Sequence, residues 1–155
     1  MVLLIVSVVS IFLCSCASAY AGKPAIFFSD LESGPHSGGQ DNKGAFVTIW
    51  GKNFGDVQKD SYITIGGGRA DNYPVWTDTK ITFQLGENAA TGAIVATTAE
   101  GTSDGIPFTV RNGDIYFVKT AGDDDGKGTW ESPWRTIIRA KRYIAAGDIV
   151  YIGDG

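Results

Sequence analysis

Short stretches of alternating hydrophobic and polar residues follow one another through the middle of the chain. The clearest hydrophobic positions are Val47 and Ile49, Ile63 and Ile65, Ile81 with Phe83 and Leu85, and Ile106 with Phe108 and Val110. Because successive residues of a strand point to opposite faces, this period predicts strands with one apolar face. Glycine-containing turns separate six or seven such strands, which can cover their apolar faces only by stacking. We therefore predict an all-β fold, a small sandwich of two sheets.

The last third of the chain has a different order of patterns. The segment "IYFV" predicts a strand, and a polar loop rich in Gly and Asp follows it. A helix is predicted to begin near Pro133, with Ser132 as its N-cap. The apolar stripe of this helix consists of Trp134, Ile137, Ile138 and Ile144. Gly147 is expected to end the helix, and residues 148–152 predict a final strand. That strand either pairs backwards with an earlier one or the sequence is cut short.

Residues 1–21 are predicted to be a signal peptide. Residues 1–13 are apolar apart from two serines, and a stretch of small residues with an A-x-A site follows them. The motif "LCSC" also resembles a bacterial lipobox, which would attach a lipid to Cys16. A retained transmembrane anchor is a third alternative, because the segment is long enough to span a bilayer. We expect a secreted or cell-surface protein, with a lipid anchor as its contact with the outer membrane if Cys16 is modified.

Composition argues against several kinds of partner and site. The net charge of -4 comes from scattered acids, so the chain of 155 residues offers no broad basic face to nucleic acid. Both cysteines, Cys14 and Cys16, lie in the leader, which leaves no thiolate for a disulfide or a metal in the mature chain. His36 is interpreted as a solvated loop residue. The aspartates at 123–125 are interpreted as a turn, because Lys127 stands where an EF-hand-like loop needs a ligand. We expect no metal and no cofactor.

The central region carries the motifs of a known family. The segments "GAFVTIWGKNFGD", "ITIGG", "WTDTKITFQLG" and "TGAIVATTAEGTSDGIPFTV" follow in this order. They resemble the IPT/TIG domain, and we assign residues 22–111 to one such module. The resemblance implies an immunoglobulin-like sandwich that serves as a spacer or interaction domain in extracellular proteins, with no catalytic residue. Gly51 and Gly55 would permit tight turns, and Phe54 would plug the end of the sandwich.

Aromatic residues supply the candidate binding site of the sandwich. The candidates are Trp50, Trp76, Tyr62 and Tyr73. Trp50 is expected on the face opposite Val47 and Ile49, where it could form a platform for sugar rings, whose C–H faces stack on indole. Packing, or cover for a sheet edge, is the alternative role of strand aromatics. The predicted partner is therefore an extracellular polysaccharide.

Residues 114–155 resemble the entry to a right-handed parallel β-helix of the pectin-lyase-like kind. The resemblance rests on "YFV", the loop "GDDDGKGT", "PWRTI" and "GDIVYIGDG" in that order. It implies a strand, a capping helix and the first strand of a first coil, with the remaining coils missing. We expect the chain to be a fragment or a truncated product, and the rest of its own β-helix domain to be a partner.

The motifs of common catalysts are missing from the sequence. It contains no nucleophile with its base, no phosphate loop and no paired-carboxylate site. We predict a non-catalytic extracellular or cell-surface module at the N-terminus of a β-helix protein, a spacer or binding domain associated with carbohydrate. The alternative is the N-terminal fragment of a secreted polysaccharide lyase or glycoside hydrolase whose active site lies beyond residue 155.

Overall fold

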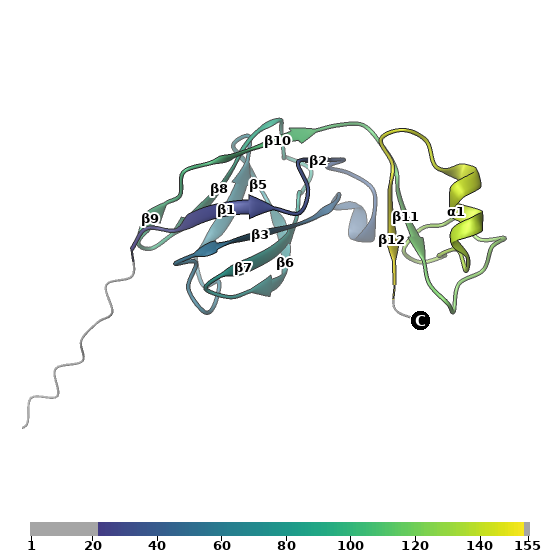
Figure 1. Cartoon of the computed structure of the whole chain (residues 1–155), viewed down its shortest axis with the longest axis horizontal. Helices are drawn as coiled ribbons and strands as arrows, with labels where there is room; N and C mark the ends of the chain where they lie inside the picture. The colour runs from purple at the N-terminus through teal and green to yellow at the C-terminus, as the bar shows by residue number, and fades with distance from the viewer. Residues whose placement is uncertain (1–21, 154–155) are drawn as a thin grey trace, which may run out of the picture.

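Two stacked β-sheets form the larger part of the molecule in the computed structural model, which describes residues 22–153 (Figure 1). The predicted signal peptide, and with it Cys16, lies outside the described residues. One sheet is antiparallel and has the strand order β1-β3-β7-β6. Its strands are β1 (Ala25–Ser29), β3 (Phe46–Lys52), β6 (Asp71–Trp76) and β7 (Lys80–Gln84).

The second sheet has the order β2-β10-β8-β4-β5, and β9 also pairs with β8. Its strands are β2 (Ser33–Gly34), β4 (Tyr62–Ile65), β5 (Gly68–Arg69), β8 (Gly92–Thr98), β9 (Gly101–Thr102) and β10 (Ile106–Val110). Only β2 and β10 run parallel in this sheet. A 3-10 turn, η1 (Gln40–Asn42), lies in the loop before β3. The prediction of an all-β, immunoglobulin-like sandwich is confirmed.

The core lies between the two sheets, where the alternating pattern places it. Val47 and Ile49 of β3 face Ile63 and Ile65 of β4, and all four side chains are inaccessible to solvent. Thr48, between the first two, points outward and its hydroxyl lies 3.1 Å from that of Thr82 on the neighbouring strand. Burial of the alternate side chains therefore fixes which face of each strand points inward.

Phe54 closes one end of this core, as the sequence predicts. Its ring is buried, and it comes so close to Gly51 that a Cβ there would meet the ring and the carbonyl oxygen of Ala25. Gly55 follows with a φ of 83°, a left-handed conformation that strains residues with a side chain. The two glycines thus allow the chain to turn tightly around the buried ring.

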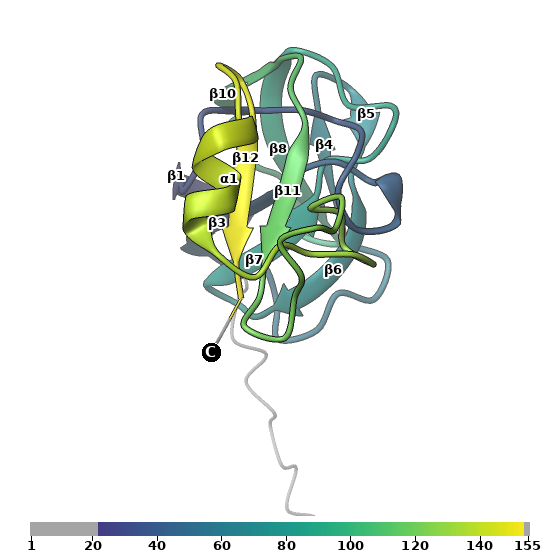
Figure 2. The same ribbon diagram turned by 90° about the vertical axis from the view of Figure 1, so that its right-hand side faces the viewer.

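A third, two-stranded sheet packs on the other end of the sandwich (Figure 2). Its strands β11 (Ile115–Val118) and β12 (Ile149–Ile152) run parallel, with Ile115 opposite Ile149. Parallel neighbours need a crossover connection, which here contains the helix α1 (Ile137–Tyr143). The final strand of the sequence therefore pairs backwards, the first of the two alternatives considered for it.

Both faces of this parallel sheet are covered, as is usual for parallel strands. Phe117 and Tyr151 point toward the sandwich and belong with its core residues to one apolar cluster. On the other face, Val118 packs with Trp134 and with Ala140 of α1. The regions predicted as separate units, 22–111 and 114–155, thus share a continuous core.

The Tyr151 hydroxyl fastens the parallel sheet to β3. It accepts a hydrogen bond of 2.8 Å from the Phe46 N–H and donates one of 3.3 Å to the Phe46 carbonyl. The two rings meet edge to face at 6.0 Å, and Tyr151 also stacks on Phe117 at 5.6 Å. Burial raises the pKa of Tyr151, so the hydroxyl keeps its proton and both hydrogen bonds.

The predicted start of the helix is wrong. α1 begins at Ile137, and its N-cap is Thr136, whose hydroxyl accepts a hydrogen bond from the Arg139 N–H at 3.2 Å. The helix ends at Tyr143, four residues before the glycine expected to stop it. Its predicted apolar stripe is mostly exposed, and Ala140 is the only buried residue of the helix.

Trp134 lies before the helix, in extended chain that bridges to Val118 of β11. Its ring is buried, stacks on Tyr116 at 4.8 Å, and donates a hydrogen bond of 2.9 Å to the Gly126 carbonyl. The tryptophan therefore fixes the loop after β11 and does not line a helix face. No helix within residues 22–153 is long and apolar enough to cross a membrane.

Candidate functional site

Two neighbouring phenylalanines of β1 expose most of their side chains. Phe27 is 60% exposed and Phe28 is 56% exposed, although successive strand residues normally point to opposite faces. The register between β1 and β3 shifts here, because Ile26 lies opposite Gly51 while Phe28 lies opposite Trp50. Phe27 is the extra residue of this β-bulge, and the bulge lets both rings reach the surface.

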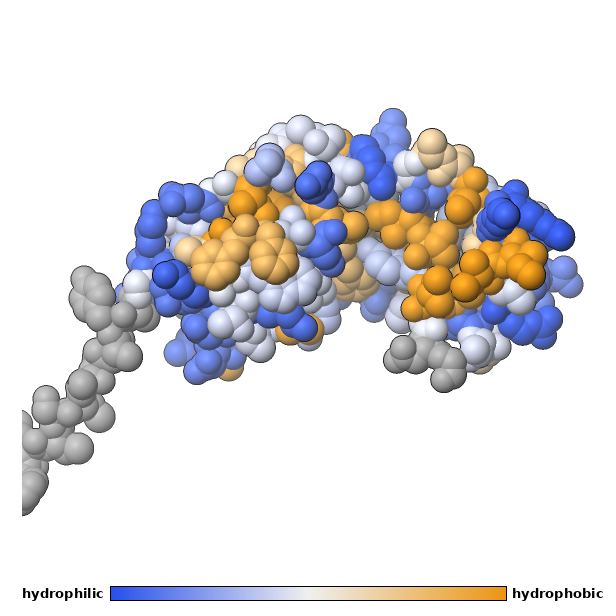
Figure 3. All heavy atoms as spheres, viewed as in Figure 1, coloured by the Kyte–Doolittle hydropathy of each residue, from blue (hydrophilic) through white to orange (hydrophobic). Residues whose placement is uncertain are grey.

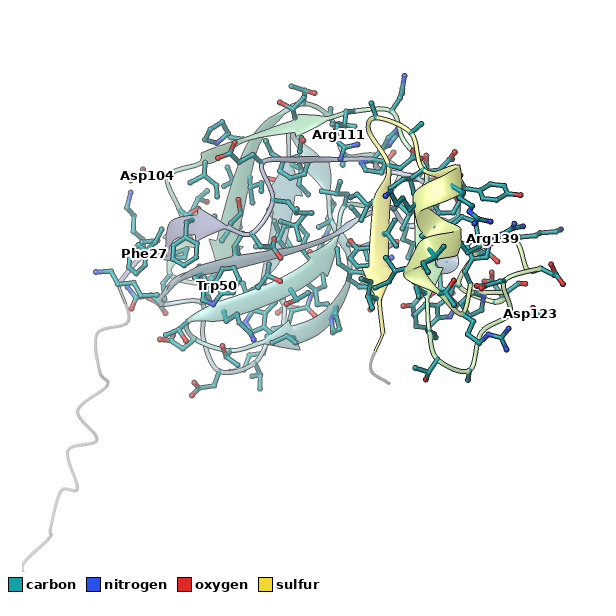
Figure 4. The ribbon with its side chains drawn as sticks, turned by 45° about the vertical axis from the view of Figure 1, so that its right-hand side comes forward. Phe27, Trp50, Asp104, Arg111, Asp123 and Arg139 are labelled. Atoms are coloured by element: carbon teal, nitrogen blue, oxygen red, sulfur yellow. The ribbon has the colours of Figure 1, made fainter. Side chains whose placement is uncertain are left out.

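Phe28 and Trp50 form a stacked pair on the outer face of the first sheet. Their ring centroids lie 5.0 Å apart and the ring planes differ by 16°. Trp50 is half-buried and points away from the core, as the alternation predicts. Figure 4 labels Phe27 and Trp50 in the same part of the sandwich. We call Phe27, Phe28 and Trp50 the aromatic edge.

The aromatic edge borders an open groove of about 770 Å³ between β1 and β10, the β1–β10 groove. The residues that line it are Phe27, Phe28, Ser29, Glu32, Thr91, Gly92, Ala93, Gly105, Ile106, Pro107, Phe108 and Thr109. Among these residues Glu32 alone is charged. Figure 3 shows apolar atoms gathered over β1 at this place and, separately, over α1 and β12.

The four aromatic residues predicted from the sequence to form one platform do not lie together in the structure. Tyr62 points outward from β4 in the second sheet, on the opposite side of the sandwich from Trp50, where the Arg69 guanidinium covers its ring at 4.3 Å. Tyr73 and Trp76 pack against the core and meet edge to face at 5.4 Å. Alternation along a strand does not show which sheet the strand joins or whether a side chain packs against the core. Of the four residues, only Trp50 contributes to the aromatic edge.

Tyr73 and Trp76 also use their polar atoms inside the fold. The Tyr73 hydroxyl accepts a hydrogen bond from the Ile63 N–H at 3.0 Å, and burial raises its pKa. The Trp76 indole donates to the Phe54 carbonyl at 3.2 Å. These contacts assign both side chains to packing, the alternative role that the sequence left open.

Sequence reasoning missed Phe27 and Phe28. The signal was present in "AIFF", where three consecutive large apolar residues break the period of two that the other strands keep. Such a run at the first strand of a sandwich indicates either a fully buried strand or a bulge.

The aspartate loop is built by its own hydrogen bonds. Asp123 accepts from the Asp125 N–H at 3.1 Å, which is the turn that the sequence predicts. Asp124 accepts from the Thr136 N–H at 2.8 Å, from the Thr136 hydroxyl at 2.8 Å and from the Arg135 N–H at 2.9 Å. Desolvation raises the pKa of Asp124, but these hydrogen bonds outweigh it, so the pKa of Asp124 is lower than its ordinary value. Asp124 thus holds the loop against the start of α1.

His36 is not simply a solvated residue, as the sequence suggested. Its Nδ1 lies 2.9 Å from the Glu87 carbonyl oxygen, which can only accept, so Nδ1 carries a proton. Within residues 22–153 no group of three or more His, Cys, Asp or Glu side chains is arranged to hold a metal ion.

The fold and its surfaces define an immunoglobulin-like β-sandwich with an exposed aromatic edge. The family model described as "IPT/TIG domain" matches residues 33–123, more than half of the chain. The chain belongs to the IPT/TIG domain family, a family of non-catalytic domains. The match runs past residue 111 and through β11 to residue 123, in keeping with the core that the two regions share.

Several solved structures are similar to the chain. A gamma-CGTase from alkalophilic Bacillus clarkii is 24% identical, with a TM-score of 0.48, over 68% of this chain and 15% of that one. An auxiliary nutrient binding protein from Bacteroides thetaiotaomicron is 17% identical, with a TM-score of 0.47, over 59% and 22%. An SGBP-B from a complex xyloglucan utilization locus in Bacteroides uniformis is 26% identical, with a TM-score of 0.42, over 57% and 23%.

The chain spans less than a third of the length of each of these proteins. A comparison with curated proteins found no match.

Proposed function

We propose that the chain is a non-catalytic extracellular module, a spacer and binding domain that precedes a parallel β-helix and associates with carbohydrate. The observation that carries the β-helix part is the apolar face beside the parallel β11–β12 pair. Ile138 is 67% exposed and Ile152 is 61% exposed, and Ile137 and Ile144 are exposed beside them. Large exposed apolar patches mark contacts with further protein.

A third parallel strand beside β12 would pair with its open edge and cover part of this apolar face. β12 pairs with β11 along one edge, and within the part of the chain that the structure describes its other edge has no strand partner. A strand from a following coil would hydrogen-bond to that edge and cover Ile152, while Lys141 and Arg142 on the exposed side of α1 stayed in water. This is how stacked coils bury the apolar face that one coil leaves open.

The coding sequence beyond residue 155 tests this part of the proposal. Successive coils with inward apolar residues support it, whereas an unrelated domain directly after residue 155 overturns it. The same coding sequence distinguishes the proposed non-catalytic module from the alternative, a secreted polysaccharide lyase or glycoside hydrolase. That alternative requires paired carboxylates, or carboxylates with basic residues, projecting together from later coils.

The carbohydrate part rests on the aromatic edge, whose exposed rings are suited to stack on the C–H faces of sugars. Incubation of the chain with pectin, alginate and neutral glucans should release no product at any pH. Reproducible product formation would refute the non-catalytic assignment. Retention of the chain by any of these polysaccharides in a native gel supports the association with carbohydrate.

A further inference from the structure

We propose that the β1–β10 groove binds a neutral polysaccharide chain, with Phe27 and Phe28 stacking on its sugar rings and Trp50 supporting the Phe28 ring from outside the groove. This inference rests on the proposed association with carbohydrate and adds its site and its charge class. The groove volume of about 770 Å³ lies within the range of roughly 300–1,000 Å³ typical of ligand sites. Because the groove is open to solvent, it suits a segment of a long chain better than an enclosed small molecule.

The exposed rings are the first reason for this assignment. Phenylalanine is among the residues most often buried, yet Phe27 and Phe28 both expose more than half of their side chains. The bulge at Phe27 is what brings the second ring to the surface. Phe28 lies against Trp50, which holds its ring in one orientation before any ligand arrives. Rings held in this way lose little conformational freedom when a ligand stacks on them.

The backbone at the groove argues against a peptide that binds as an added strand. Such a strand needs free N–H groups along an edge. The Thr109 N–H points to this side of β10, because it donates to the Glu32 carbonyl at 2.9 Å. Alternation then directs the backbone nitrogen of residue 107 to the same side, but Pro107 has no N–H to donate. The bulge at Phe27 interrupts the facing edge of β1. Recognition in the groove therefore does not rely on a ladder of backbone N–H groups.

Charge then selects among glycans. The exposed carboxylate of Glu32 lies in the groove, and the lining residues within 22–153 include no Lys or Arg. A uronic-acid polymer would bring its own carboxylates toward Glu32 without a cation to pair with them. Hydroxyl groups of a neutral sugar can instead donate to that carboxylate. The groove accordingly fits a neutral polysaccharide and disfavours pectin-like or alginate-like chains.

Affinity electrophoresis of the purified chain tests the proposal. Native gels would contain mixed-linkage β-glucan or galactomannan as neutral probes, and polygalacturonate or alginate as acidic probes. We expect a neutral probe to retard the chain, and Phe27→Ala and Trp50→Ala each to weaken its binding about tenfold. Ile138→Ala removes a similarly exposed apolar side chain from α1 and should leave the retardation by the polysaccharide unchanged. Glu32→Gln should narrow the preference for neutral over acidic probes.

The outcomes separate the inference from the function on which it rests. If no polysaccharide retards the unmodified chain, the association with carbohydrate fails and the groove assignment falls with it. Retardation that survives both substitutions, with melting temperatures unchanged, overturns the groove and leaves the association standing. Stronger binding to the acidic probes overturns the charge class. A dimer that Phe27→Ala dissociates, measured by light scattering, would show the groove to be a contact between two copies and also overturn the proposal.

Discussion

Removal of the Tyr151 hydroxyl should destabilise the whole described fold and not only its C-terminal strand. In Tyr151→Phe the ring contacts with Phe46 and Phe117 remain, but the N–H and C=O of Phe46 lose their partner. A buried polar group left without a hydrogen bond costs about 1–3 kcal/mol. At roughly 2–4 °C per kcal/mol for a chain of this size, the melting temperature should fall by roughly 2–12 °C.

Urea unfolding followed by tryptophan fluorescence measures this loss, since tryptophans lie in both regions. Tyr143→Phe is the matched control, because the Tyr143 side chain is exposed on α1. The control should shift the unfolding free energy by less than about 0.5 kcal/mol. Because the two regions share a core, Tyr151→Phe should still unfold in one transition. Two separate transitions, or a loss no larger than that of the control, would refute the coupling through Tyr151.

The pH dependence supplies a second check on the same residue. Burial raises the pKa of Tyr151 above its unfolded value, so the folded state favours the neutral phenol. Its contribution to stability is complete below about pH 10 and is lost as the pH rises through the folded pKa. Tyr151→Phe should therefore lose less stability than the unmodified chain between neutral and strongly alkaline pH. Equal alkaline slopes would contradict this reasoning.

Two further substitutions test buried or capping polar groups. Gln84 is fully buried, donates to two backbone carbonyls and accepts a hydrogen bond of 2.9 Å from Asn72. Because Gln84→Leu leaves these partners unpaired, it should lower the free energy of unfolding by about 1–3 kcal/mol. An unchanged urea midpoint would contradict this prediction. Hydrogen bonds from Thr136 and Arg135 lower the pKa of Asp124 despite its desolvation, so its contribution is present above about pH 4 and lost as the pH falls through the folded pKa. Asp124→Asn should lower the melting temperature at pH 7 and flatten its decline in acid, and parallel melting curves from pH 7 to 2 would exclude this role.

The strands were predictable because burial on one face imposes a period of two on the sequence. Val47, Ile49, Ile63 and Ile65 are buried where the alternation places them. The same reasoning failed for Gln84, which alternation assigns to the outer face of β7. There the loop around η1 covers it, and its amide donates to the carbonyls of Gln40 and Gly44. A loop that folds back over a sheet leaves no period in the sequence.

The candidate site was less predictable for a related reason. A bulge adds one residue, so Phe27 breaks the alternation that would otherwise assign its direction. Trp134 shows the opposite failure, since its spacing from Ile137 and Ile138 fits a helical stripe. Tertiary contacts override that spacing, because the Trp134 indole donates a hydrogen bond to the Gly126 carbonyl and its backbone bridges to β11 before the helix begins. Local periodicity cannot register a partner that is distant along the chain.

The two apolar surfaces lie toward opposite ends of the long axis, the aromatic edge on β1 and the exposed isoleucines on α1 and β12 (Figures 1 and 3). Between them the sandwich core continues without interruption into β11 and β12. A polysaccharide held in the β1–β10 groove would therefore leave the open edge of β12 free for a further strand. Because the two surfaces share no residues, Phe27→Ala should weaken polysaccharide binding whereas Ile138→Ala should not, and the double variant should bind as weakly as Phe27→Ala alone.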